Sequence, residues 1–435
     1  MLKPLGESIL TERESYRKTM KTVLTNRNIL GIGLTTALWS VANSGWRPFR
    51  LMYLKEELGA TIVILGLLSM LTSSEQLLFQ LPGGILADKF GRRKIIVYGT
   101  TLRIISPLIY LFATHWTQVI PAMICEGAAS VYMPAFRAII ADSLPENERG
   151  AGYGAYRMLT SMPRIFSPMI GGIVMDNMGY KEGAKVFLIA AAIAGVIITV
   201  VRYRIITETL VQKSKPKRQT RRSLLSHLKP EADFPRTIKI MLVVAIVGSF
   251  GSRMVTEFIP VYAIDVIGLT NTQYGLVQTS MAVITTVLAF PGGILADRMG
   301  RKPVILLSRV VSPLTILGVT LSSTFQHYFL VRCTSSFGAA LGGGGMGFAG
   351  GPAWNALIAD IVPPEHRGTV LGTISTLTGF IGAPSAAIGG YLWATYYPQL
   401  PFQISSIVGI IGAIIFALGV KEPKRNTEQK GDLQP

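Results

Sequence analysis

Long apolar runs separated by short polar segments dominate this chain. A membrane-spanning helix needs about 20 mostly apolar residues, and each half of the chain supplies runs of that kind. The first half has them at residues 29–54, 62–86, 95–114, 118–140, 152–173 and 184–201. The second half has them at residues 240–264, 274–294, 304–321, 328–358, 370–393 and 402–420. The pattern predicts an all-α membrane protein with twelve transmembrane helices in two six-helix halves.

The polar segments between these runs set the expected domain boundaries. We expect a cytoplasmic N-terminal segment at 1–28, a six-helix half at 29–201, a cytoplasmic linker at 202–239, a second half at 240–420 and a cytoplasmic tail at 421–435. The linker contains the basic stretch KSKPKRQTRR and few residues that would form a core. The first 28 residues have no apolar core before a small-residue cleavage site, so we expect no cleaved signal peptide.

Basic residues lie mainly on one side of the predicted membrane. The loops that follow odd-numbered spans contain only Lys55, Lys181 and Lys185 as Lys or Arg residues, while the other loops hold the rest. This asymmetry predicts that both termini and the linker are cytoplasmic, in a multi-pass protein of the plasma membrane. It also explains the formal charge of +18 without a nucleic-acid partner, so we expect none.

Composition narrows the classes of function further. Charged residues make up 15% of the chain and hydrophobic residues 49%, which suits a bilayer better than water. Cys125 and Cys333 lie in apolar runs and offer neither a disulfide framework nor metal-ligand spacing. The sequence has no nucleotide-binding loop of the G-x-x-x-x-G-K-S/T type and no recognisable catalytic constellation. We therefore expect no enzyme activity, no catalytic residues, no metal and no cofactor.

Three sequence stretches of the first half recur in the second. PGGILADKFGRRK at 82–94 returns as PGGILADRMGRKP at 291–303, directly after the second span of each half. LRIISPL at 102–108 returns as SRVVSPL at 308–314, and PAFRAIIADSLPENERG at 134–150 returns as PAWNALIADIVPPEHRG at 352–368. The halves are therefore internal repeats with the same orientation.

The loop G-x-x-A-D-R/K-x-G-R-R/K, its copy, and the loop D-x-x-P-x-x-x-R-G after the fourth span resemble the major facilitator superfamily over the whole chain. The resemblance implies two helical domains around a midplane cavity that opens alternately to each side of the membrane. It also implies that charged clusters latch the cytoplasmic helix ends. The gating residues expected from it are Asp88, Arg92, Asp142, Arg149, Asp297, Arg301, Asp360 and Arg367.

Charged residues inside the spans are candidates for substrate or proton sites, because a charge in the bilayer is costly unless it is paired or hydrated. Those without an ionisable counterpart in the other half are Glu75, Glu126, Arg164, Arg253, Glu257 and Arg332. Arg103 and Arg309 occupy matching positions, which favours a structural role over substrate contact. Arg253 and Glu257 lie four residues apart, so mutual neutralisation is the alternative for that pair.

The fifth span gives a further hint about exchange. Proton-coupled antiporters of the superfamily carry G-x8-G-x3-G-P-x2-G-G there, and this chain matches at Gly154, Pro168, Gly171 and Gly172 but has Pro163 and Ser167 at the other two glycine positions. Helix packing is an equal explanation. The tenth span contains the glycine run LGGGGMGFAGGP at 341–352, where we expect the helix to bend or break.

The leading hypothesis is a secondary active transporter that moves a small solute by alternating access, with proton-coupled efflux as its mode. The alternatives are an uptake carrier or uniporter for an organic anion or nutrient, and, from another class, a transport-inactive sensor on the same fold. The expected partners are a small-molecule substrate, protons and the lipid bilayer, and we expect a monomer.

Overall fold

The computed structural model describes residues 25–144, 156, 158–209, 234–342 and 352–422. Within them the chain forms helices and connections, with no strand. It divides into two compact units, and each is described here by itself. Unit 1 comprises Met1–Lys217 together with Phe258–Thr279, and unit 2 comprises Arg218–Glu257 together with Ser280–Pro435.

Unit 1 is built on helices that follow the first six predicted spans. The elements are α2 (Arg27–Ser44), η1 (Arg47–Phe49), α3 (Arg50–Glu56), α4 (Ile62–Phe90), α5 (Arg92–Phe112), η2 (Trp116–Val119), α6 (Ile120–Ala129), η3 (Ser130–Tyr132), α7 (Met133–Asp142), η5 (Met162–Arg164) and α9 (Ser167–Ile205). Backbone dihedrals leave the helical region at Gly179 inside α9 (φ 74°). This turn separates the fifth span from the sixth.

Unit 2 follows the later spans in the same way. Its elements are α10 (Arg236–Thr256), the larger part of α12 (Asn271–Met299), α13 (Arg301–Leu321), α14 (Phe325–Gly342), α15 (Pro352–Ile361), α16 (Pro364–Gly382), α17 (Ser385–Thr395) and α18 (Leu400–Gly419). The short helices α11 (Ile259–Val261) and η7 (Tyr262–Val266) and the start of α12 belong to unit 1. The expected break in the tenth span falls at residues outside the described ranges.

Seven helical stretches of the described chain are long and apolar enough to cross a membrane. One of them, 158–205, contains the turn at Gly179 and so covers two predicted spans. The order of the helices is consistent with twelve spans, and the all-α fold class predicted from the hydropathy pattern is confirmed.

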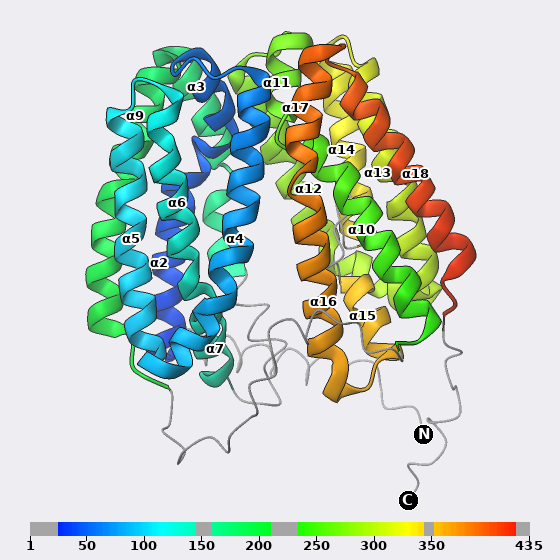
Figure 1. Ribbon diagram of the computed structural model, residues 1–435, viewed down its shortest axis with the longest axis horizontal. Helices are drawn as coiled ribbons and strands as arrows, with labels where there is room; N and C mark the ends of the chain where they lie inside the picture. Colours follow the sequence, from blue (N-terminus) through cyan, green and yellow to red (C-terminus); the bar gives the residue numbers. More distant parts are fainter. Residues whose placement is uncertain (1–24, 145–155, 157, 210–233, 343–351, 423–435) are drawn as a thin grey trace, which may run out of the picture. The chain divides into compact units, whose positions relative to one another are not determined.

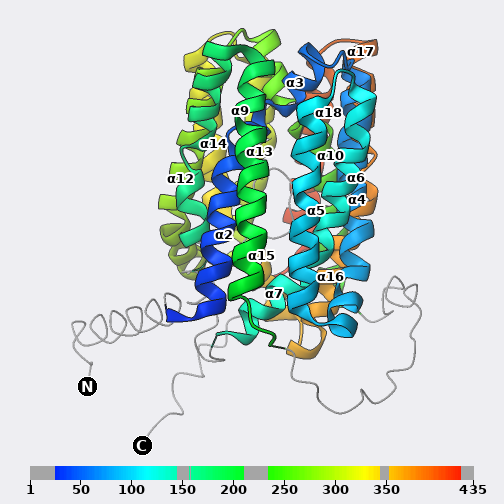
Figure 2. The same cartoon turned by 90° about the vertical axis from the view of Figure 1, so that its left-hand side faces the viewer.

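The same packing occurs in each unit. In unit 1, α9 packs against both α2 and α5, and α5 packs against α6 (Figure 1). In unit 2, α18 packs against both α10 and α13, and α13 packs against α14. Figure 2 shows α2, α9 and α5 after a turn of 90° about the vertical axis. The two repeats of the sequence therefore fold as two copies of one helix arrangement.

Glycines permit the closest helix contacts of unit 1. A Cβ atom on Gly172 would lie 2.7 Å from the carbonyl carbon of Asn271, and one on Gly275 would lie 2.9 Å from the Cα of Met169. Real Cβ atoms do not approach backbone so closely, so α9 and the start of α12 meet backbone to backbone. Gly171 and Gly172 of the antiporter-like pattern thus have a packing role.

Candidate functional site

A cavity of about 330 Å³ lies inside unit 1. Its walls come from α2, α3, α4, α5, α6, α7 and α9, together with η1, η3 and η5. Five arginines and two glutamates line it, alongside the aromatic side chains of Trp39, Trp46, Tyr132 and Phe136. A concave space with aromatic walls and a few convergent charged groups is typical of a small-molecule site.

Glu126 is held in this cavity by contacts to two helices. Its Oε2 lies 3.8 Å from Nη1 of Arg50, and its Oε1 accepts a hydrogen bond of 2.6 Å from the hydroxyl of Ser106. Arg50 is only 9% exposed. The pair joins α6, α3 and α5, so a change at Glu126 affects three elements of the cavity wall.

Glu75 is the other carboxylate of the cavity and is 4% exposed. Neither of its carboxylate oxygens has a hydrogen-bond partner among the described residues. The side chain lies directly over Gly127, where a Cβ atom would stand 2.7 Å from Oε2 of Glu75. An ionised carboxylate is costly to bury without such partners. The glycine therefore admits a polar group whose hydrogen-bonding capacity is unused.

Two arginines of the cavity have aromatic rather than acidic neighbours. The guanidinium of Arg103 lies 4.4 Å from the ring centroid of Trp39, and its Nη1 donates to the hydroxyl of Tyr132 at 2.5 Å. The guanidinium of Arg202 lies over the rings of Tyr132 and Phe136, at 5.5 and 5.4 Å. Threonine hydroxyls complete the shell of Arg202: its donors reach Thr35 at 3.1 Å, Thr100 at 2.8 Å and Thr36 at 3.3 Å.

Of the remaining in-span candidates, Arg164 shares the cavity with Glu75 and Glu126, and the three in unit 2 do not line it. Arg164 is exposed. In unit 2, Arg332 is 5% exposed within α14, Arg253 lies against Gly382, and Glu257 is exposed at the end of α10. The sequence alone did not separate these residues from Glu75 and Glu126.

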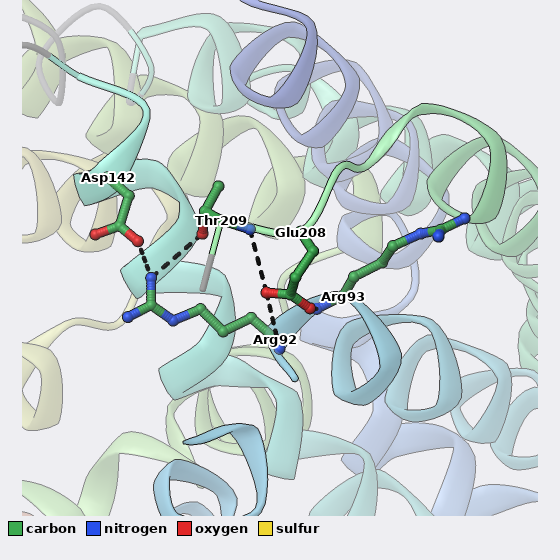
Figure 3. A network of polar contacts seen from close by, with 5 residues as sticks. All are labelled: Arg92, Arg93, Asp142, Glu208 and Thr209. Atoms are coloured by element: carbon green, nitrogen blue, oxygen red, sulfur yellow. Dashed lines mark hydrogen bonds and ion pairs between the residues drawn. The ribbon is translucent and has the colours of Figure 1, made fainter. Parts of the chain in front are cut away.

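A charged network joins helix ends in unit 1, on the side of the predicted cytoplasmic loops (Figure 3). Arg92 pairs with Asp142 and also donates to the hydroxyl of Thr209 at 3.3 Å. Glu208 accepts hydrogen bonds from the backbone N–H groups of Arg92 and Arg93, at 3.3 and 3.0 Å. The segment after α9 is thereby tied to the first turn of α5.

Unit 2 repeats this network with its own residues. Nε of Arg301 lies 3.0 Å from the carboxylate of Asp360. Glu422 accepts from the backbone N–H groups of Arg301 and Lys302, at 2.6 and 3.3 Å. Arg367 differs from the expectation, because it donates to the carbonyls of Ala359 and Val362, at 2.6 and 3.1 Å. It thus caps the end of α15.

The other expected gating residues give no described ion pair. Asp88 is exposed and has neither a hydrogen bond nor an ion pair within the described ranges. Arg149 and the side chain of Asp297 lie outside the described part. The structure therefore brings together one acidic and one basic gating residue in each unit, with a glutamate that sequence reasoning missed.

A second set of polar contacts lies at the opposite end of unit 1. Lys55 pairs with Asp265 at 2.7 Å. Asp176 accepts hydrogen bonds from the backbone N–H groups of Asn271 and Thr272, at 3.0 and 2.7 Å, and from the side-chain amide of Asn271 at 2.9 Å. The carboxylate thus caps the N-terminus of α12 from another helix.

The pKa of Asp176 reflects these contacts. The residue lies in the connection between the fifth and sixth predicted spans. Burial alone would raise its pKa, but hydrogen bonds from Thr272 and Asn271 hold the pKa of this carboxyl below its ordinary value. These hydrogen bonds therefore favour the ionised form of Asp176.

Sequence reasoning missed Arg202, Glu208, Glu422 and Asp176. The hydropathy pattern counted Arg202 as a linker charge, whereas the structure places it in α9 with 3% exposure. No common signal in the sequence pointed to the two glutamates. The predicted spans end at 201 and 420, so Glu208 follows by seven residues and Glu422 by two, and the flanking letters TETL and KEPK differ. In the structure each lies three residues past the last helix of its half, which ends at Ile205 or at Gly419.

Comparison with known proteins supports a transporter family. A profile of the Major Facilitator Superfamily matches residues 30–274 and again 241–435. Multidrug resistance protein 2 of Bacillus subtilis (strain 168) is 26% identical over 340 residues, which cover 75% of this chain and 78% of the relative. The quinolone resistance protein NorA of Staphylococcus aureus is 28% identical over 179 residues, 41% of this chain and 43% of NorA.

Solved structures show the same fold at low identity. The nucleoside transporter NupG has a TM-score of 0.68 and 15% identity, over 90% of this chain and 98% of that protein. The human organic anion transporter MFSD10 (TETRAN) has a TM-score of 0.64 and 15% identity, over 91% of this chain and 99% of that protein. The family profile covers both halves, where the repeated loop motifs and the repeated helix packing also lie. This multi-pass membrane protein therefore belongs to the Major Facilitator Superfamily of transporters.

Proposed function

We propose that this protein is a proton-coupled secondary transporter that exports a small organic solute, with Glu75 as the residue that carries the proton. The observation that supports the proposal best is the buried carboxylate of Glu75, whose two oxygens have no hydrogen-bond partner among the described residues. Multidrug and quinolone resistance proteins among the relatives support the direction of export.

Glu75 suits proton transfer because its ionised and neutral forms differ greatly in the free energy of burial. The ionised form is buried without hydrogen bonds, whereas the neutral form avoids that penalty. The Arg50–Glu126 pair lines the same cavity. A proton or a charged substrate that enters the cavity therefore changes the balance between the two forms, and this is the differential interaction that coupling requires.

Glu126 and Glu257 suit the role less well. Glu126 already has Ser106 and Arg50 as partners, which stabilise its ionised form. Glu257 is exposed at the end of α10, outside the cavity of unit 1. We keep Glu126 as the residue that positions Arg50 next to the proton site.

The two charged networks fit the role of gates in this mechanism. Arg92–Asp142 and Arg301–Asp360 occupy equivalent positions of the two repeats, and each joins a loop motif to the end of a neighbouring helix. Ion pairs between helix ends form and break at small cost when water reaches them. We propose that they latch the cytoplasmic helix ends during alternating access.

The test is flux in liposomes that contain the purified protein and an internal pH-sensitive dye. An imposed pH gradient should drive solute accumulation in the parent, and addition of solute should move protons in the opposite direction. Glu75→Gln should lose both responses, because a neutral amide exchanges no proton. Glu57→Gln removes an exposed carboxylate outside the cavity and should behave as the parent does.

Two results would overturn the proposal. Proton-driven accumulation by Glu75→Gln at the parental rate would exclude Glu75 as the carrier of the proton. A parent that moves solute at the same rate with and without the gradient would be a uniporter or an exchanger of solutes. In the first case Glu57→Gln controls for a general effect of losing a carboxylate.

The proposal includes a topology and an assembly. We propose a plasma-membrane location, cytoplasmic termini and a cytoplasmic linker, supported by the distribution of Lys and Arg among the loops. A monomer is the proposed working unit, since one chain supplies the whole cavity of unit 1. In a cysteine-free background, Ser214→Cys should resist an impermeant thiol reagent added outside intact cells, and labelling from outside would contradict this topology.

A further inference from the structure

We propose that the cavity of unit 1 selects organic anions, and that Arg202 together with Arg103 forms the subsite for their negative group. The inference rests on the proposed carrier function and adds a substrate class to it. Its ligands are amphipathic: an aromatic or apolar body with a carboxylate or a similar anionic head.

The charge of the cavity wall supports this substrate class. With both glutamates ionised, the lining has three more positive than negative groups. Arg50 and Glu126 compensate each other, and Glu75 alternates between charge states in the proposed mechanism. Four other arginines line the cavity, and two of these, Arg103 and Arg202, have described hydrogen bonds and ring contacts but no carboxylate within ion-pair distance among the described residues.

Burial makes the missing counter-charge costly. Arg202 is 3% exposed and lies in α9, within a helical stretch, 158–205, that is long and apolar enough to cross a membrane. Threonine hydroxyls accept hydrogen bonds from the guanidinium and aromatic faces pack against it, but neither supplies a full negative charge. Truncating a buried charge pair costs several kcal/mol because one charge is left uncompensated. An anionic ligand would restore the missing partner, so the site favours it over a cation.

Comparison of the two repeats shows that this pair of arginines is specific to one half. Counted from the capping glutamates Glu208 and Glu422, Arg202 occupies the register position that Phe416 occupies in unit 2. Arg309, the counterpart of Arg103, lies 5.5 Å from the ring centroid of Phe416 and 4.7 Å from that of Trp354. An arginine stacked on aromatics is therefore common to both repeats, and the second cation is present only in unit 1.

The aromatic residues of the cavity define the other end of the ligand. Trp39 and Tyr132 contact the arginines, and Trp46 lies edge-on to Tyr110 with 5.2 Å between ring centroids. Flat apolar groups pack well against such faces. A rigid aromatic acid thus matches both parts of the lining, whereas a small inorganic anion would leave the aromatic wall uncovered.

The test is calorimetric binding of three probes that share a ring and differ in charge: naphthylacetate, naphthylethylamine and naphthylethanol. The full-length protein in detergent should bind the acid at least tenfold more tightly than the amine or the alcohol. Arg202→Met and Arg103→Met should each weaken binding of the acid by roughly tenfold, the usual effect of losing one charge-assisted contact.

Arg204→Met is the matched control, because it removes the same charge two residues away on an exposed position of α9 that does not line the cavity. Its affinity for the acid should equal that of the parent. Arg202→Lys replaces Arg202→Met if that variant does not elute as a folded monodisperse species. Arg202→Lys should bind the acid more weakly than the parent protein does. It should still bind the acid more tightly than it binds the amine.

Equal or tighter binding of the amine by the parent would overturn the inference, as would parental affinity for the acid in Arg202→Lys and Arg103→Met. Calorimetry needs no transport cycle. Selective binding of the acid without pH-driven flux would therefore contradict only the proposed transport function. Flux of a cation without binding of the acid would contradict only the substrate class.

Discussion

Gly127 determines whether Glu75 can occupy its buried position. The glycine lies under the glutamate side chain, and a Cβ atom there would stand 2.7 Å from Oε2 and 3.0 Å from Cγ of Glu75. The residue therefore acts on the proposed proton site without any polar group of its own. Because Gly127 has no side chain, it leaves the space that the carboxylate of Glu75 occupies in either charge state.

We expect Gly127→Ala to displace Glu75 and to impair gradient-driven transport. Overpacking of this kind costs about 1–3 kcal/mol, so the thermal midpoint in detergent should fall as well. Gly84→Ala is the control, because a Cβ atom at Gly84 would meet only the Cβ of Pro134 at 3.9 Å. Parental flux in Gly127→Ala would show that the position of Glu75 is not critical for coupling.

The sequence singled out Glu75 and Glu126, which the structure places in one cavity, and did not single out Arg202, which lines the same cavity. A carboxylate inside an apolar run can be recognised from the sequence, because burying a charge in the bilayer is costly whatever its neighbours in the fold are. Arg202 stands at the edge of its run, where an arginine ordinarily extends into water. Only the positions of Thr35, Thr100 and Tyr132 show that it turns inward.

At the level of elements, each repeat uses a distant glutamate to cap a helix whose own N-cap residue is glycine. Gly91 and Gly300 precede α5 and α13 with φ of 93° and 95°, a conformation that favours glycine, and neither offers a side chain. Glu208 and Glu422 supply the missing acceptors. The carboxylates also lie next to the positive end of the helix dipole.

We expect Glu208→Ala to destabilise unit 1 by about 1 kcal/mol, the usual cost of losing an N-cap acceptor. Glu182→Ala is the control, because it removes an exposed carboxylate on the opposite side of the predicted membrane. Oε1 of Glu182 lies 2.5 Å from Nζ of Lys185. The measurement is the thermal midpoint in detergent. A larger loss from Glu182→Ala than from Glu208→Ala would argue against the capping role.

The contact of Asp176 with α12 should not depend on pH across the range in which the carrier works. Its pKa is lowered in the folded state, so its stabilising contribution is fully present above the pKa of the unfolded chain and is lost as pH falls through the lower folded value. Asp176→Asn should lower the thermal midpoint by a similar amount at pH 5 and at pH 8, corresponding to about 1 kcal/mol. A difference that vanishes at pH 5 would contradict this assignment.

The sequence predicted the helices better than it predicted the contacts between them. The repeated motifs identified Arg92 with Asp142 and Arg301 with Asp360, because matching positions in two copies imply a task performed twice. Glu208 and Glu422 lie in dissimilar segments, so no motif draws attention to them. Asp176 finds its partner 95 residues away in the chain, beyond any local pattern.

For the whole molecule, the division into compact units departs from the division into sequence repeats. Residues 258–279 follow the linker in the chain but belong to unit 1. Asp265 pairs with Lys55 in that unit, and Phe49 lies edge-on to Tyr274 with 5.9 Å between ring centroids. The hydropathy pattern places all of 240–264 in the second half and gives no sign of this crossing.

We expect a fragment that ends in the linker, at residue 225, to be less stable alone than when it is co-expressed with the fragment 226–435. The isolated first fragment lacks Asp265, one of the two carboxylates that pair with Lys55, and the groups of Asn271 and Thr272 that donate to Asp176. Protease resistance of the first fragment in membranes measures the difference. Equal resistance with and without the second fragment would show that residues 258–279 add little to unit 1.

The contribution of residues 258–279 to unit 1 also affects how the protein is made. A chain is synthesised from its N-terminus, and domains generally fold as units while synthesis proceeds. The first six spans leave the ribosome before their last partners exist, since Asp265 and Asn271 follow the linker in sequence. In the inserted first half, Lys55 therefore lacks Asp265 and Asp176 lacks its donors on Asn271 and Thr272 until the seventh span and the start of α12 have been synthesised.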